Sequence, residues 1–107
     1  MVGSIYFVDM PYSNFQQAKA RPVMVFKIID KNDLLIMPLT TNLNREGFIL
    51  KNDDIQAGSL KKQSVVIIPK ITAIDSSLIG SNNFIATIKP SVFEDILQNM
   101  CKKLACS

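Results

Sequence analysis

An arginine stands directly before an apolar run in the segment AKARPVMVF, residues 18–26. Pro22 follows Arg21, and a proline is tolerated in a sheet only at the start of a strand or on an edge. The arginine guanidinium is a planar fork that can bind two phosphate oxygens at once. We therefore interpret Arg21 as a candidate phosphate ligand at the mouth of a strand, with a solvated rim residue as the alternative.

Hydroxyl and ammonium groups supply further candidates. Thr40 and Thr41, in the segment MPLTTN, could donate hydrogen bonds to phosphate oxygens or could simply end a strand. Ser64 begins an apolar run, where serine commonly bonds to nearby backbone. Lys61 and Lys62 are, taken alone, typical of a solvated turn.

The composition excludes several reaction classes. The chain has 107 residues and no histidine, so it contains no Ser-His-Asp triad and no Cys-His pair. Two cysteines, Cys101 and Cys106, make neither a disulfide framework nor a zinc set, and we expect reduced thiols, no metal and no cofactor. The net charge of +3 favours polyanions as partners.

The apolar content is high, with 48% hydrophobic residues and a mean hydropathy of +0.20. No apolar run approaches the roughly 20 residues that span a bilayer. The opening segment MVGSIYFVDM has no basic stretch and contains an acid, so we expect no signal peptide, no membrane association and a cytoplasmic protein. Surplus apolar surface would serve a partner.

These candidates need a β scaffold to hold them. Runs of β-branched and aromatic residues predict a single domain over residues 1–107, mainly β with a C-terminal helix, folded as a small antiparallel barrel. Residues 52–62 are expected to form an exposed connection, and residues 76–80 one helical turn. The strands are predicted over residues 4–10, 21–29, 34–40, 47–51, 63–75 with a bend at Pro69, and 82–88.

The last segment, PSVFEDILQNMCKKLA, has the clearest periodicity. Its apolar residues recur with the 3.6-residue period of a helix, which predicts one helix over residues 90–105 with a buried face. Ser91 and Glu94 fit a capping box at its start. Lys102 and Lys103 lie in its last turn, where cations suit the helix dipole.

The order of these segments resembles that of the MazF/PemK-like toxins, the endoribonucleases of bacterial toxin–antitoxin modules. The resemblance spans nearly the whole chain. It rests on an opening strand that ends in Asp, an Arg-Pro strand, a strand that ends in threonine, a Ser-Val strand that continues to Ile-Asp, and the closing helix. In this chain these are GSIYFVDMP, ARPVMVF, MPLTTN, LKKQSVVIIPKITAID and the helix over residues 90–105.

The resemblance implies an SH3-like barrel that forms a homodimer and cuts single-stranded RNA without a metal, with an acidic antitoxin as partner. It implies that Arg21 and Thr40 are the catalytic residues. Expected RNA-binding residues are Gln17, Lys19, Thr41, Lys61, Lys62 and Ser64, and Tyr12 or Phe15 would stack on bases.

The general base stays open, because a guanidinium keeps its proton at neutral pH and is therefore a poor proton acceptor. Arg21 is better interpreted as a phosphate clamp and proton donor. Two other functions also stay open. One is a gyrase-poisoning toxin of the CcdB type, although the tail CKKLACS lacks the Trp-Gly-Ile type of ending. The other is a non-catalytic binding module, since the loop before Arg21, YSNFQQAKA, is not glycine-rich.

Overall fold

The computed structural model describes residues 1–10, 19–68 and 70–105. It contains strands, short 3₁₀ turns and one α-helix, in an order that agrees with the predicted mainly-β class. The elements are β1 Ser4–Met10, β2 Lys19–Ile28, β3 Asp33–Thr40, β4 Phe48–Leu50, η1 Asn52–Asp54, β5 Ile55–Gly58, β6 Ser64–Val66, β7 Thr72–Asp75, η2 Ser76–Leu78, η3 Ser81–Asn83, β8 Phe84–Ile88 and α1 Pro90–Leu104.

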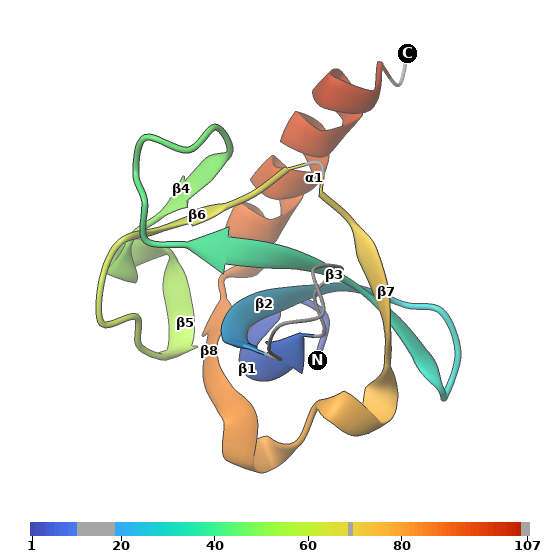
Figure 1. Cartoon of the computed structure of the whole chain (residues 1–107). Coiled ribbons are helices and arrows are strands. Elements are labelled where there is room, and N and C mark those ends of the chain that lie inside the picture. Colours follow the sequence, from blue (N-terminus) through green and yellow to red (C-terminus); the bar gives the residue numbers. More distant parts are fainter. Residues whose placement is uncertain (11–18, 69, 106–107) are drawn as a thin grey trace.

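The strands form one antiparallel sheet in the order β4-β6-β3-β2-β1-β8-β5, with β7 attached to the side of β3. The sheet curves strongly, so that β5, β8 and β7 arch around the central hairpin of β1 and β2 (Figure 1). β3 is the branch point, because its first half pairs with β7 and its end pairs with β6. This curved sheet confirms the predicted small barrel.

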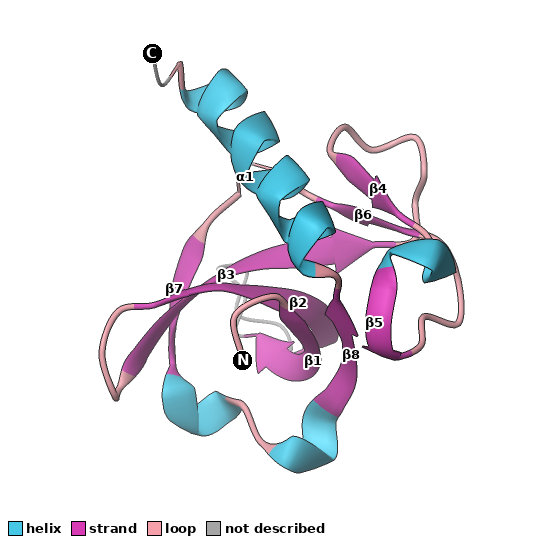
Figure 2. Cartoon of the chain, turned by 180° about the vertical axis from the view of Figure 1, so that it is seen from behind, coloured by secondary structure: helices cyan, strands magenta, loops and turns pink. Residues whose placement is uncertain are grey.

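The central strands are buried on both faces, as expected for continuous apolar runs. Successive residues of β2 alternate between two cores: Met24 faces one, and Val23 and Val25 face the other. The first core lies between the sheet and helix α1, which crosses the back of the sheet (Figure 2) and contributes Val92 and Ile96. The second core lies on the opposite face and holds Tyr6, Val8, Leu34, Ile36 and Ile74 beside the two valines.

Helix α1 follows the predicted period but not the predicted cap. Its N-cap is Lys89, which makes no capping hydrogen bond with its side chain, and Pro90 takes the first helical position. Ser91 is therefore inside the helix and the predicted capping box is wrong. Proline outweighs serine here because its fixed φ suits the first turn and the N–H that it lacks has no partner there.

The connection predicted over residues 52–62 proved to contain a strand. Residues 55–58 form β5, which pairs with β8 at the edge of the sheet. The segment predicted as one strand over residues 63–75 is two, β6 and β7, which bind different parts of β3. The predicted bend at Pro69 lies outside the described residues. In that part of the chain which the structure describes, no helix has the length and apolar character needed to cross a membrane.

One ion pair links the end of helix α1 to the loop between β3 and β4. Lys103 Nζ donates a hydrogen bond of 2.8 Å to Glu46 Oε1, and this bond and the Lys103 charge lower the pKa of Glu46. The contact therefore stabilises the fold fully above the ordinary glutamate pKa of about 4.3, and its contribution is lost as the pH falls through the lowered value.

We expect Lys103→Ala to raise the Glu46 pKa toward its ordinary value, because both causes of the shift are removed. Titration of the Glu46 carboxyl by NMR in the two proteins measures this. Lys102→Ala, a change of the same charge one residue away, is the control and should leave the Glu46 pKa lowered. An unchanged Glu46 pKa in Lys103→Ala would contradict the ion pair in solution.

Candidate functional site

The ends of β2 and β3 bring the two candidate catalytic residues to one face of the sheet. The strands are antiparallel, and their last pair before these ends is Val23 with Pro38. Residues two positions apart in a strand share a face. Continuing the register by two residues sets Arg21 across from Thr40, on the face that carries Val23. Both residues are half-buried.

Arg21 is also held from its other side, since it pairs with Val8 of β1 in the β1–β2 ladder. A residue fixed between two neighbouring strands has little backbone freedom, so its guanidinium starts from a defined position. The charge of a guanidinium at neutral pH is permanent. The site therefore has a cation whose backbone position is fixed by the sheet and whose charge can attract an oxyanion.

Within the described part of the chain, the Thr40 hydroxyl oxygen is held by one hydrogen bond. Its Oγ1 accepts a hydrogen bond of 3.2 Å from the backbone N–H of Asn42. Because the oxygen is the acceptor in this bond, the hydroxyl proton is still available for donation. The bond to Asn42 orients the hydroxyl at the point where β3 ends. Thr40 is thus suited to donate to an oxygen on the Arg21 face.

A hollow of about 490 Å³ opens beside this pair. Pro22 and Thr41, the sequence neighbours of Arg21 and Thr40, both line it. Since neighbouring residues of a strand point to opposite faces, Pro22 points away from the Arg21 face, and the hollow lies around the end of the sheet from it. Its walls are Phe7, Pro22, Thr41, Ser59, Leu60, Lys61, Lys62, Ser64, Phe84 and Ile85.

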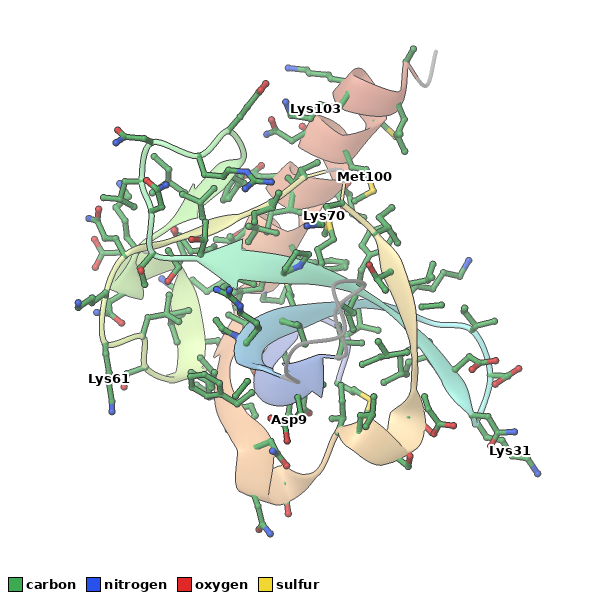
Figure 3. All side chains as sticks on the ribbon, in the orientation of Figure 1. Asp9, Lys31, Lys61, Lys70, Met100 and Lys103 are labelled. Atoms are coloured by element: carbon green, nitrogen blue, oxygen red, sulfur yellow. The ribbon has the colours of Figure 1, made fainter. Side chains whose placement is uncertain are left out.

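The hollow gathers most of the residues expected to bind RNA. Thr41, Lys61, Lys62 and Ser64 come from different parts of the chain and meet there. They meet because β6 follows the lysines directly and pairs with the end of β3. Figure 3 shows Lys61 projecting from the molecule into solvent. The hollow therefore has a cationic edge.

The other residues expected to bind RNA are buried, lie in a strand or fall outside the described residues. Ser64 is only 6% exposed and its hydroxyl donates to the Lys62 carbonyl at 3.2 Å, so it also shapes the lysine turn, as its position at a strand start suggested. Lys19 lies in β2, paired with Met10. Gln17, Tyr12 and Phe15 lie outside the described residues.

Two aromatic residues of the site were missed in the sequence. Phe7 and Phe84 line the hollow and are 48% and 41% exposed. Phe7 stands in the apolar run SIYFVDM, where alternation of buried and exposed positions is hidden because almost every residue is apolar. Phe84 lies opposite Tyr6, next to an irregularity in the β1–β8 pairing, and no sequence signal revealed that irregularity. The one usable signal was the excess of aromatic residues in the first strand.

The described residues contain no group of three or more histidine, cysteine, aspartate or glutamate side chains that could hold a metal ion. What the site does offer is cationic and neutral: a guanidinium, a hydroxyl, two ammonium groups and two aromatic rings. Such a set suits a ligand that carries both phosphates and flat rings.

Comparison with known proteins identifies the family of the chain. The family model for the PemK-like, MazF-like toxin of type II toxin–antitoxin systems matches residues 1–104. A search of curated proteins found no match. The match covers almost the entire chain, from β1 to the end of helix α1. The chain therefore belongs to the PemK-like, MazF-like toxins of type II toxin–antitoxin systems.

Proposed function

We propose that this toxin is an endoribonuclease that cuts single-stranded RNA without a metal and so stops translation. The observation that supports this most is the register of β2 and β3, which, continued by two residues, aligns Arg21 with Thr40 at the end of the sheet where the hollow edged by lysines opens. This arrangement meets the needs of one reaction, the transfer of an RNA phosphodiester to its own 2′-hydroxyl.

RNA carries the nucleophile, so the protein must supply alignment and charge stabilisation. The 2′-oxygen attacks phosphorus and loses its proton to a base, while the bond from phosphorus to the 5′-oxygen breaks and that oxygen gains a proton. Alignment of such groups is worth about 7–11 kcal/mol. The products are a 2′,3′-cyclic phosphate and a 5′-hydroxyl.

Arg21 would bind the non-bridging oxygens and stabilise the charge of the phosphorane. Each donor aimed at developing charge is worth about 2.7–4 kcal/mol. Thr40 would donate a hydrogen bond to the same phosphate, and Arg21 would also protonate the leaving oxygen. The base is not assigned to a residue.

The other proposed contacts follow from charge. Lys61, Lys62 and Lys19 would neutralise phosphates along the strand, which makes binding weaker as salt rises. Gln17, Thr41 and Ser64 would contact the nucleotides near the cut. Membership in a type II toxin family implies an antitoxin partner. We propose an acidic one that occupies the phosphate positions, a homodimeric toxin, and action in the cytoplasm, where mRNA is translated.

The test is cleavage of a long single-stranded RNA in the presence of EDTA. We expect discrete cuts that leave 2′,3′-cyclic phosphate and 5′-hydroxyl ends, identified by their resistance or susceptibility to end-specific enzymes. A DNA of the same sequence should stay intact, because it lacks the nucleophile. Failure to cut any of a varied set of RNAs would refute the proposal, and inhibition of gyrase by the same sample would favour a toxin of the other kind.

A further inference from the structure

One side of the hollow is formed by two aromatic side chains, Phe7 and Phe84, to which the proposed nuclease function assigns no role. Phe7 and Phe84 are both exposed by more than two fifths of their surface. Phe84 is nevertheless held in place, since its ring makes an edge contact with the buried ring of Tyr6 at 5.8 Å and 74°. Phe7 is fixed on β1, opposite Pro22 in the ladder. The hollow thus presents the ring of Phe84, ordered by Tyr6, and the ring of Phe7 on a backbone that the sheet holds in place.

Among the residues that the structure describes, the rest of the lining is free of acids. Besides the two rings it consists of neutral residues and the lysine pair Lys61–Lys62. These lysines follow β5 on the left of the molecule, whereas Lys31 extends from the far hairpin on the right (Figure 3). An apolar wall with cations at its edge complements a flat base that is attached to a phosphate.

The position of the hollow indicates which nucleotide of the RNA would place its base there. Pro22 and Thr41 line it and directly follow Arg21 and Thr40 in the chain. Arg21 and Pro22 are neighbours at one end of β2, so an RNA strand bound by a phosphate at Arg21 can turn around this end of the sheet and bring a base into the hollow. Its volume of about 490 Å³ falls inside the usual range of small-molecule sites, about 300–1,000 Å³, and accommodates one base.

We propose that this hollow binds the base next to the scissile phosphate, stacked on Phe7 and Phe84, while Lys61 and Lys62 bind the adjoining phosphate. This inference rests on the proposed nuclease function and adds the position where base preference arises. A base that leaves a single strand stacks on aromatic side chains, and such stacking tolerates every base but favours the larger ones.

The key variant is Phe7→Leu, which keeps an apolar side chain and removes the ring. Affinity is measured by fluorescence anisotropy with short labelled 2′-O-methyl oligonucleotides, which cannot be cut because the 2′-oxygen is blocked. We expect a loss of roughly 5- to 100-fold, as for removal of one base–aromatic stack. Phe7→Trp, which keeps a ring, should retain the affinity.

The lysines are tested by salt dependence. Replacing Lys61 and Lys62 by alanine should flatten the dependence of log affinity on log salt by about 0.7 for each phosphate that the variant no longer neutralises. Lys31→Ala is the matched control and should leave both affinity and slope unchanged, because Lys31 lies on the opposite side of the molecule from Lys61 (Figure 3) and does not line the hollow.

The outcomes separate this inference from the nuclease proposal. If Phe7→Leu binds and cuts RNA with the affinity and base preference of the parent protein, the stacking site is refuted while the nuclease function stands. If the parent protein cuts no RNA, the oligonucleotide affinities of Phe7→Leu and Phe7→Trp still decide whether the hollow holds a base. If Phe7→Leu lost binding to an acidic peptide but kept the oligonucleotide affinity of the parent protein, the inference would be overturned. The occupant of the hollow would then be a protein side chain.

Discussion

Arg21→Ala should reduce RNA cleavage by at least about 10³-fold, the loss seen when a cationic group that stabilises a phosphoryl transition state is removed. The reason is that Arg21 is the one arginine on the face shared with Thr40, and its charge would act on the phosphorane more than on the ground state. The measurement is the single-turnover rate on an RNA with one mapped cut. The unfolding free energy of the variant is measured beside the rate, so that a loss of catalysis is distinguished from a loss of folded protein; the strand pairing of Arg21 with Val8 uses backbone groups and stays available to the variant.

Two further variants make this prediction specific. Arg21→Lys keeps the charge but loses the planar fork, so we expect a rate between those of the parent protein and Arg21→Ala. Arg45, the other arginine of the chain, is exposed in the loop before β4, and Arg45→Ala changes the net charge by the same amount. Equal rate losses in Arg45→Ala and Arg21→Ala would mean that overall charge, not a clamp at Arg21, drives the reaction.

The sequence predicted the parts of this site that depend on long apolar runs. β1, β2 and β3 lie within two residues of their predicted bounds because each run is apolar enough to be buried on both faces. The helix was equally clear, since its period leaves one buried stripe. These elements carry Arg21 and Thr40, so the candidate pair could be anticipated from the chain alone.

The side of the site that depends on the pairing of β5 with β8 could not be predicted from the sequence. β5 has only four residues, and those that follow its first isoleucine are exposed, so its sequence resembles a loop. It exists because β8 offers an edge to which it can bond. Phe84 reaches the hollow through the same strand, β8. Features that arise from long-range pairing leave little local signal, so Phe7 and Phe84 were not predicted as part of the site, while Tyr12 and Phe15 stay predictions for the loop.

The pairing of β5 with β8 depends on Gly58, and Gly58→Ala should therefore destabilise the fold strongly. Gly58 has φ +75°, and a Cβ added there would lie 2.3 Å from the Ile85 carbonyl oxygen and 2.8 Å from Ala86 Cα. Both are backbone atoms of the paired strand, so the strand itself must move. Backbone strain of about 1–3 kcal/mol and overpacking of about 1–3 kcal/mol together predict a loss of about 2–6 kcal/mol.

Urea unfolding followed by circular dichroism measures this loss, with Gly80→Ala as the matched control. At Gly80 an added Cβ would meet only Asn83 Oδ1, at 3.4 Å, and the backbone is extended, so the change should be close to neutral. A loss below about 1 kcal/mol in Gly58→Ala would show that β5 is not held as described. If the loss is as large as expected, oligonucleotide affinity should fall with it, because Gly58 directly precedes the segment that carries Lys61 and Lys62, and its partner strand carries Phe84.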